Sequence, residues 1–286
     1  MAYLTEEKVQ ELQRLACAIR ETTIRSLVAS GENGTNGHTA GPLGMADVFA
    51  VLYFHTLNHD PKNPDWDERD RLILSHGHIT PVRYAAMAHA GYFPIEECMT
   101  LRHFGSRLQG HPERHFLPGI ETTSGPLGSG LSQAGGIAYG ARMDGKKFRV
   151  ICLMSDGEQQ EGNIWEAAMF VAKNRLTNLT ALLDRNNIQI SGNTEDVMPL
   201  EPLADKYKAF GWHVMEIDGH NIEEIADAFE EAKAIQEKPT VIVANTIPGK
   251  GVKTIENDYK WHGMPPKSEQ LGTFLAELHS ACGVNH

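Results

Sequence analysis

RVICLMSDGE, residues 149–158, joins a continuous apolar run to a short run of small and acidic residues. An uninterrupted apolar run of this length is typical of a parallel strand that is buried on both faces of a sheet. A second stretch has the same design, because LTALL at 179–183 runs directly into DRNNI at 184–188. One helix and one returning strand fit between the two stretches. We therefore expect both polar loops at the same carboxyl edge of one sheet, where ligands bind in such folds.

Strand and helix patterns alternate through the rest of the chain. Further strands are expected over 71–75, 212–217 and 240–246, and Asn221 is expected to cap a helix between the last two. Other helices are expected over 5–29, 45–57, 79–90, 164–174 and 268–282, with irregular chain over 30–44 and 102–128. This order predicts a single doubly wound α/β domain over residues 1–286, with a mostly parallel sheet flanked by helices.

Composition excludes several classes of function. Lys and Arg number 26 against 37 Asp and Glu, a formal net charge of −11. Nucleic-acid binding requires clustered positive charge, so no nucleic-acid partner is expected. No apolar run approaches the roughly 18 residues of a membrane span, and the charged N-terminus does not resemble a secretory signal. The four cysteines (Cys17, Cys98, Cys152 and Cys282) form no CxxC pair, which predicts free thiols in a reducing cytoplasm.

The two polar loops carry oxygen donors that suit a divalent cation. The Asp156 carboxylate, the Asn186 amide oxygen and a nearby backbone carbonyl, completed by phosphate oxygens and water, suit Mg²⁺, with Ca²⁺ or Mn²⁺ as alternatives. Gly157 lacks a side chain, so a diphosphate could approach the backbone N–H groups of the next helix. The competing interpretation is an Asp-Gly turn beside an unrelated Asn-Asn turn.

Histidine is the other unusual feature. Nine of the fourteen histidines lie between His38 and His115, among glycines and prolines. Such a dense cluster favours a catalytic or anion-binding face, although single histidines are common at satisfied polar positions.

SDG at 155–157, followed by the asparagine of DRNNI, resembles the diphosphate-binding motif of thiamine diphosphate enzymes, whose usual form begins GDG. The surrounding sequence resembles the transketolase family in six blocks: NGHTAGPLG (36–44), RLILSHGHITPVRYA (71–85), LQGHPE (108–113), ETTSGPLGSGLSQAGGIA (121–138), SDGEQQEGNIWEAA (155–168) and WHGMPP (261–266). The blocks follow the order of the N-terminal domain of a transketolase and cover essentially the whole chain. The resemblance implies the thiamine-diphosphate-binding fold, with this chain as its diphosphate domain.

The resemblance also implies the cofactor site. Mg²⁺ would be bound by Asp156, the side chain of Asn186 and the backbone carbonyl of Ile188. The residues implied as contacts of thiamine diphosphate come from four loops and are His78, Gly125, Pro126, Leu127, Gly157, Glu158, Asn186 and His262.

Four histidines are implied as catalytic: His38, His78, His111 and His262. His38 and His111 resemble family histidines that contact the hydroxyls of the donor sugar and assist its proton transfers, and His262 would face the substrate with them. Glu161 resembles an acidic interface residue that couples paired active sites. His76 occupies a position where the family usually has Asn. Its role is not assigned, and it is a candidate for adjusting which substrate the site accepts. Ser155 replaces the usual first glycine of the motif. The loop around His38 also differs from the family pattern, so the identity of the donor and acceptor sugars is not predicted.

Transketolase chemistry also needs a pyrimidine-binding domain with an activating glutamate, and no segment here resembles that domain. We therefore predict the N-terminal subunit of a two-chain transketolase, a transferase that moves a two-carbon ketol unit from a ketose phosphate to an aldose through a thiamine diphosphate adduct. Its partner would be a separate C-terminal subunit in a heterotetramer of two plus two, contacted through 122–136 and the helix after Gly162. The alternatives are an α-type subunit of a 2-oxo-acid dehydrogenase-like enzyme and a non-catalytic assembly subunit.

Overall fold

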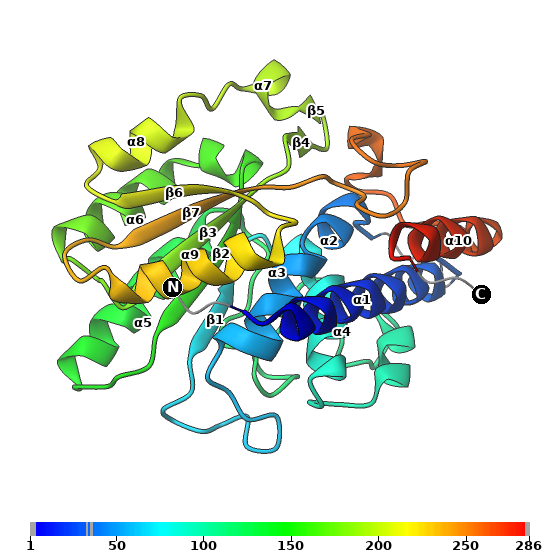
Figure 1. The fold of residues 1–286 in the computed structure, drawn as a ribbon, viewed down its shortest axis with the longest axis horizontal. Coiled ribbons are helices and arrows are strands. Elements are labelled where there is room, and N and C mark those ends of the chain that lie inside the picture. The colour runs from blue at the N-terminus through cyan, green and yellow to red at the C-terminus, as the bar shows by residue number, and fades with distance from the viewer. Residues whose placement is uncertain (1–3, 33, 35–36, 284–286) are drawn as a thin grey trace.

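A five-stranded parallel sheet forms the centre of the computed structural model, which describes residues 4–32, 34 and 37–283. The strand order is β1–β2–β3–β7–β6, and each neighbouring pair runs parallel. The strands are β1 (Arg71–Leu74), β2 (Val150–Ser155), β3 (Leu179–Arg185), β6 (His213–Asp218) and β7 (Thr240–Asn245). A short antiparallel ribbon of β4 (Ile188–Gln189) and β5 (Gly192–Asn193) follows β3. Figure 1 shows the sheet enclosed by helices.

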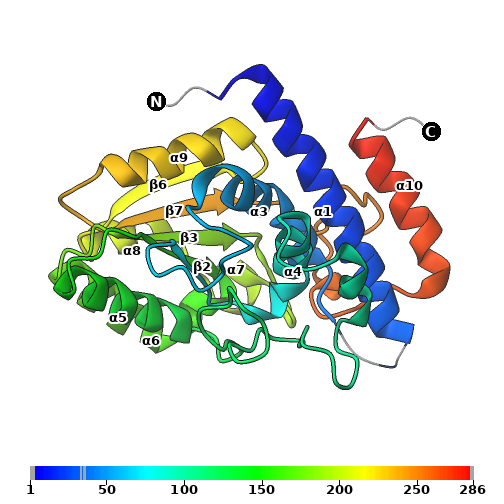
Figure 2. The ribbon, with the colours of Figure 1, turned by 90° about the horizontal axis from the view of Figure 1, so that it is seen from below.

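Successive residues of the strands point to opposite faces of the sheet and pack into two separate apolar cores. In β2, Ile151 and Leu153 join one core, whereas Val150, Cys152 and Met154 join the other. The first core is completed by α1 (Glu6–Glu32), α3 (Ala46–Val51), α4 (Thr80–His89) and α9 (Ile222–Ala234). The second is completed by α5 (Ser129–Met143), α6 (Gly162–Lys173) and α8 (Leu203–Ala209). Figure 2 shows the sheet between these two groups, which confirms the predicted doubly wound fold.

The remaining helices are short or peripheral. They are α2 (Ala40–Gly44), α7 (Thr194–Val197), α10 (Leu271–Ala281), the π-helix η1 (Leu52–Thr56) and the 3₁₀ turns η2 (Gly77–Ile79), η3 (Ile95–Thr100), η4 (Gly157–Gln160), η5 (Tyr259–Trp261) and η6 (Ser268–Gln270). None of the helices in the described part of the chain is both long enough and apolar enough to cross a bilayer.

One local prediction was wrong, and one long helix was not predicted. Residues 40–44, expected to be irregular, form α2, and α5 was not predicted at all. Gly41 and Gly44 serve close packing, because a Cβ on either would lie 3.0 Å from an atom of Ile79 or Ile247. The helix expected over 45–57 is α3 followed by the π-helix η1.

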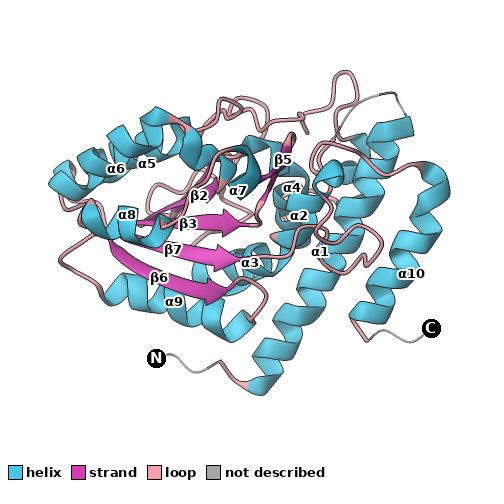
Figure 3. Cartoon of the chain, turned by 90° about the horizontal axis from the view of Figure 1, so that it is seen from above, coloured by secondary structure: helices cyan, strands magenta, loops and turns pink. Residues whose placement is uncertain are grey.

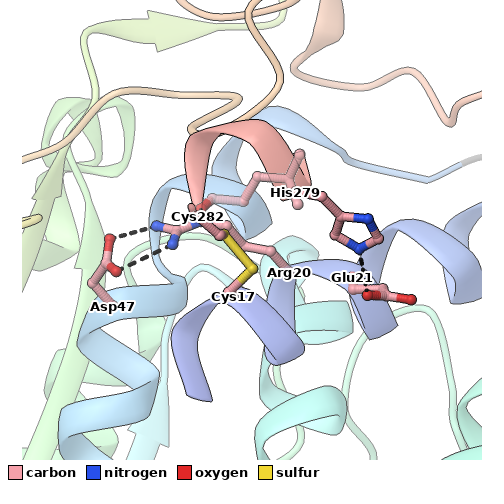
Figure 4. Close-up of a disulfide and its surroundings, with 7 residues drawn as sticks. Cys17, Arg20, Glu21, Asp47, His279 and Cys282 are labelled. Atoms are coloured by element: carbon pink, nitrogen blue, oxygen red, sulfur yellow. Dashed lines mark hydrogen bonds and ion pairs between the residues drawn. A yellow bond between two sulfur atoms is a disulfide. The ribbon is translucent and has the colours of Figure 1, made fainter. Parts of the chain in front are cut away.

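The prediction of four free thiols was also wrong. Cys17 on α1 and Cys282 after α10 form a disulfide with a Cα–Cα distance of 6.3 Å, whereas Cys98 and Cys152 are free and buried. A sequence separation of 265 gave no sign of this pair, which depends on α10 packing along α1 (Figure 3). Figure 4 shows the junction, where His279 also hydrogen-bonds Glu21 at 2.8 Å.

α10 supports the segment that leads to His262. Phe274 and Leu278 of α10 share an apolar cluster with Val252 and Ile255 of that segment. The ring of Trp261 also packs edge-on against Phe274, with centroids 5.4 Å apart. Because Trp261 directly precedes His262, the packing of α10 sets the position of that histidine.

Candidate active site

A pocket of about 370 Å³ opens at the carboxyl edge of the sheet. The arrowheads of β3, β6 and β7 in Figure 3 point toward this side of the molecule. Loops from both halves of the sequence line the pocket through His38, His78, His111, Gly125, Leu127, Ser155, Gly157, Glu158, Gln160, Glu161, Ile188, Gln189, Ile190, Ser191 and His262. The structure therefore brings most of the predicted site residues together. Pro126 is exposed and is not part of the lining.

Three imidazoles form one wall of the pocket. The ring centroids of His38 and His78 are 4.7 Å apart, those of His78 and His262 5.1 Å, and those of His38 and His262 5.4 Å. The Nδ1 atoms of His38 and His262 are buried and have no hydrogen-bond partner among the described residues. Unsatisfied buried nitrogens are costly, so this wall is suited to hydrogen bonds with a polar ligand.

Burial keeps these imidazoles neutral. It lowers the pKa of His38 to about 3, with further contributions from His262, Arg102 and His111, and it lowers the pKa of His262 to about 4. Burial, with the neighbouring imidazoles, also holds the pKa of His78 well below its ordinary value. A neutral imidazole carries one donor and one acceptor, so at neutral pH the wall can both give and receive hydrogen bonds.

His76 and His111 flank this wall. His76 is fully buried, and its Nδ1 lies 3.1 Å from the carbonyl oxygen of Leu153. Its Nε2 has no partner in the part of the chain that the structure describes. Its ring centroid is 5.8 Å from that of His78, and burial lowers its pKa to about 4. His111 is at the exposed rim, where burial of part of its ring and the charge of Arg102 lower its pKa.

The predicted metal ligands Asp156 and Asn186 lie beneath the pocket at neighbouring strand ends. Ser155 of β2 pairs with Asp184 of β3, so the two loops share one edge as predicted. The Asp156 carboxylate accepts hydrogen bonds from the backbone N–H of Gly157 at 2.6 Å and from that of Asn187 at 2.7 Å. It also pairs with Arg185 at 3.0 Å.

The orientation of the Asn186 amide fits an oxygen ligand. Its Nδ2 donates to a carboxylate oxygen of Asp184 at 2.8 Å, so its Oδ1 faces the other way and accepts from the N–H of Ile188 at 3.0 Å. Burial raises the pKa of Asp156, opposed by Arg185, while burial and the nearby Asp156 raise the pKa of Asp184 to about 7. A cation beside two buried acids would favour their ionised forms. Within the described residues no three His, Cys, Asp or Glu side chains gather as a metal cluster. The predicted ligand set differs from such a cluster, because it has one carboxylate, one amide oxygen and one backbone carbonyl.

The Glu158 side chain is hydrogen-bonded within the protein. Its carboxylate is fully buried and accepts hydrogen bonds from the Ser75 hydroxyl and from the backbone N–H groups of Gly128 and Ser155. All of these partners belong to the protein, so only the backbone of Glu158 is left for a cofactor. Glu161, in contrast, is exposed at the pocket rim and precedes α6.

Comparison with known proteins identifies this arrangement. The family model described as transketolase, thiamine diphosphate binding domain, matches residues 16–285. The chain belongs to the transketolase family. This transketolase-family chain is 45% identical over 275 residues to a 6-deoxy-6-sulfo-D-fructose transketolase subunit of Clostridium sp. (strain MSTE9), which covers 96% of this chain and 98% of that relative. It is 38% identical to an apulose-4-phosphate transketolase subunit of Actinobacillus succinogenes, with 94% and 96% of the two chains covered.

Solved structures agree with the family assignment. Transketolase from Campylobacter jejuni superposes with a TM-score of 0.86 at 34% identity, over 97% of this chain and 43% of that one. The transketolase-family chain therefore spans nearly the full length of the two subunit relatives and less than half of the solved transketolase. The predicted family, fold and transferase class are confirmed, and these findings favour a transketolase subunit over the 2-oxo-acid dehydrogenase alternative.

Some lining residues were not predicted. Gln160, Gln189, Ile190 and Ser191 contribute to the pocket, the last three from the β4–β5 ribbon. The Oε1 atom of Gln189 is buried, with no hydrogen-bond partner within residues 4–32, 34 and 37–283. No hydrophobic period marks a ribbon this short, so the only available sequence signal was its position directly after DRNNI.

Proposed function

We propose that this chain is the diphosphate-binding subunit of a two-chain transketolase that moves a two-carbon ketol unit from a ketose phosphate to an aldose. The observation that carries the proposal is the wall of three neutral imidazoles facing the loop of Gly157, above Asp156 and Asn186. Relatives of the same length are named transketolase subunits, which supports a separate partner. Those relatives are named for two different sugars, sulfofructose and apulose phosphate. The donor and acceptor sugars of this chain therefore have to be determined by assay.

The residues divide the work between cofactor and sugar. Thiamine diphosphate, when bound, supplies the nucleophilic carbon for ketol transfer. The backbone at Gly157 would hold its diphosphate, because Gly157 presents no side chain there, and His78 and His262 would donate hydrogen bonds to it. Gly125 and Leu127 would enclose it from the opposite loop. His38 and His111 would bind the sugar hydroxyls and carry protons to and from the oxygen atoms of the donor.

A divalent cation, with Mg²⁺ the first choice, would bind the Asp156 carboxylate, the Asn186 amide oxygen and the Ile188 carbonyl. The orientation of the Asn186 amide and the raised pKa values of Asp156 and Asp184 support this assignment. All three donors are oxygen atoms, which is the preference of Mg²⁺ and Ca²⁺. Diphosphate oxygens would complete the shell.

The partner would cover exposed apolar side chains on the two helices that begin near the pocket. Leu127, Met143, Met169 and Phe170 are large apolar side chains with 37–72% of their surface exposed, on α5, α6 and the loop before α5. Obligate interfaces bury surfaces of this character. We assign this face, with Glu161, to the partner subunit in an assembly of two plus two, and we propose that residues 1–286 form one domain.

A cytoplasmic location of this enzyme is a proposal that rests on the sugar phosphate substrates, because the disulfide of Cys17 and Cys282 removes the argument from free thiols.

Calorimetric titration of thiamine diphosphate into the chain with its co-purified partner tests the proposal. We expect saturable binding with Mg²⁺ and its loss in EDTA, together with ketol transfer over a panel of sugar phosphates. Binding without any transfer would favour the non-catalytic assembly subunit, and absence of binding would overturn the proposal.

A further inference from the structure

The Glu158 carboxylate joins three segments that each lead into the pocket. Its first partner, the Ser75 hydroxyl, directly follows β1 and precedes the His76-Gly77-His78 turn. Its second, the N–H of Gly128 at 2.5 Å, lies at the start of α5, directly after the loop of Gly125. Its third, the N–H of Ser155 at 3.1 Å, ends β2 beside Asp156. One side chain thus holds the three loops that enclose the proposed diphosphate site.

The junction has no room to rearrange. A Cβ on Gly130 would lie 2.4 Å from the Cβ of Ser75, and a Cβ on Gly128 would lie 1.9 Å from the Asn163 amide oxygen. Gly128 also has a φ of +82°, which favours glycine. Gly128 and Gly130 therefore leave no space for a side chain where α5 meets Ser75 and Asn163.

The same contacts cap α5 from outside the helix. Gly128 has no side chain with which to cap, and the first amides of a helix need acceptors. Glu158 accepts from Gly128, while the Ser75 hydroxyl accepts from Gly130 at 3.0 Å and donates to Glu158. A carboxylate at this end of α5 is also favoured by the helix dipole.

We propose that Glu158 is a positioning residue, whose side chain holds the three loops in the geometry for thiamine diphosphate without itself touching the cofactor. The identity of the ligand rests on the proposed function. The set of hydrogen bonds from Ser75, Gly128 and Ser155 to Glu158, here called the clamp, stands on the structure alone. An ionised carboxylate has acceptors for all three donors, whereas a glutamine of the same shape brings an N–H₂ group that must face a donor. Glu158→Gln should therefore loosen the loops with little change in volume.

Three variants of the full chain test the clamp in complex with the partner. Glu158→Gln and Ser75→Ala each remove part of the junction, and Glu237→Gln makes the same chemical change at an exposed site in the α9–β7 connection. We expect Glu158→Gln to weaken thiamine diphosphate binding by about 10–100-fold. A loss of this size is typical when a residue that orients the ligands of a metal site is changed. At saturating cofactor, turnover should stay near that of wild type. Ser75→Ala should weaken binding less, and Glu237→Gln not at all.

Hydrogen exchange without cofactor separates the clamp from the proposed function. Glu158→Gln should speed exchange of the Gly128 and Gly130 amides and of residues 76–78, while the central strands exchange as in wild type. Wild-type affinity in both Glu158→Gln and Ser75→Ala, or exchange that speeds equally over the whole sheet, would overturn the clamp. If wild type itself fails to bind thiamine diphosphate, the proposed function falls, and the exchange pattern still decides the clamp.

Discussion

Single residues at the pocket differ in whether their polar atoms are already satisfied. Asp156 and Glu158 are both buried and lie two positions apart, and both carboxylates accept hydrogen bonds from backbone N–H groups of the protein. Among the residues that the structure describes, the buried Nδ1 atoms of His38 and His262 have no partner. These unsatisfied nitrogens mark where a ligand would bind.

Asp156→Asn should abolish cofactor binding that depends on metal. The substitution keeps the size of the side chain but removes the only carboxylate among the three proposed ligands. Changing a residue that only hydrogen-bonds to a metal ligand typically weakens binding ~10–100-fold. Because Asp156 is itself a proposed ligand, we expect thiamine diphosphate affinity to fall by more than this. Calorimetry with Mg²⁺ and with EDTA measures this, and an affinity in wild type that chelation leaves unchanged would refute the metal assignment.

His38→Ala and His111→Ala should lower turnover far more than cofactor affinity. Both side chains are assigned to the sugar, where one imidazole typically contributes about 10²–10⁴-fold to the rate. Steady-state kinetics at saturating cofactor, beside the calorimetric affinity, gives the comparison. Kinetics like those of wild type in both variants would show that these histidines are structural.

The buried histidines also predict how stability depends on pH. The pKa is about 3 for His38 and about 4 for His262, below the roughly 6.5 of an unfolded chain. The unfolded chain therefore binds more protons, and this stability is complete above about pH 6.5 and is lost as pH falls toward those values. Asp184, with a pKa of about 7, acts in the opposite direction, so the test compares variants.

His262→Gln should lose less stability than wild type on acidification. Urea unfolding of the cofactor-free chain between about pH 7.5 and about pH 5 measures the difference. Parallel curves for the two proteins would contradict the assignment of His262 as a buried neutral imidazole.

At the scale of elements, continuous apolar runs were predicted well and glycine-rich helices were not. β2 and β3 were predicted because burial on both faces leaves an uninterrupted apolar run, and their pairing placed the two polar loops together. α5 was missed because its glycines lower helix propensity while allowing close packing, as at Gly130 against Ser75. Local sequence does not record such long-range contacts.

The link between α1 and α10 predicts a stability that depends on reductant. Cys282→Ser removes the disulfide, and we expect a loss of about 2–4 kcal/mol in the free energy of unfolding. Wild type in dithiothreitol should fall to the same value, whereas the variant should not respond to the reagent. Equal stability of all samples would contradict the pairing of Cys17 with Cys282.

At the scale of the whole molecule, the site is open on the side where a partner is proposed. Most of the predicted site residues line one pocket, because the motifs that carry them lie in loops at one edge of the sheet. The role of Glu158, the Cys17–Cys282 pair and the β4–β5 ribbon could not be predicted, since each depends on contacts between distant segments. Apolar side chains on α5 and α6 stay exposed on this chain.

We propose that this chain carries one half of a thiamine diphosphate site and acts only with a second subunit. The direct measurement is two-carbon transfer by the purified chain with saturating thiamine diphosphate and Mg²⁺, first alone and then with the co-purified partner. We predict no transfer by the chain alone and transfer on addition of the partner, in proportion to the complex formed. Robust transfer by the chain alone would contradict it, because the pyrimidine half of the site would then lie within these 286 residues.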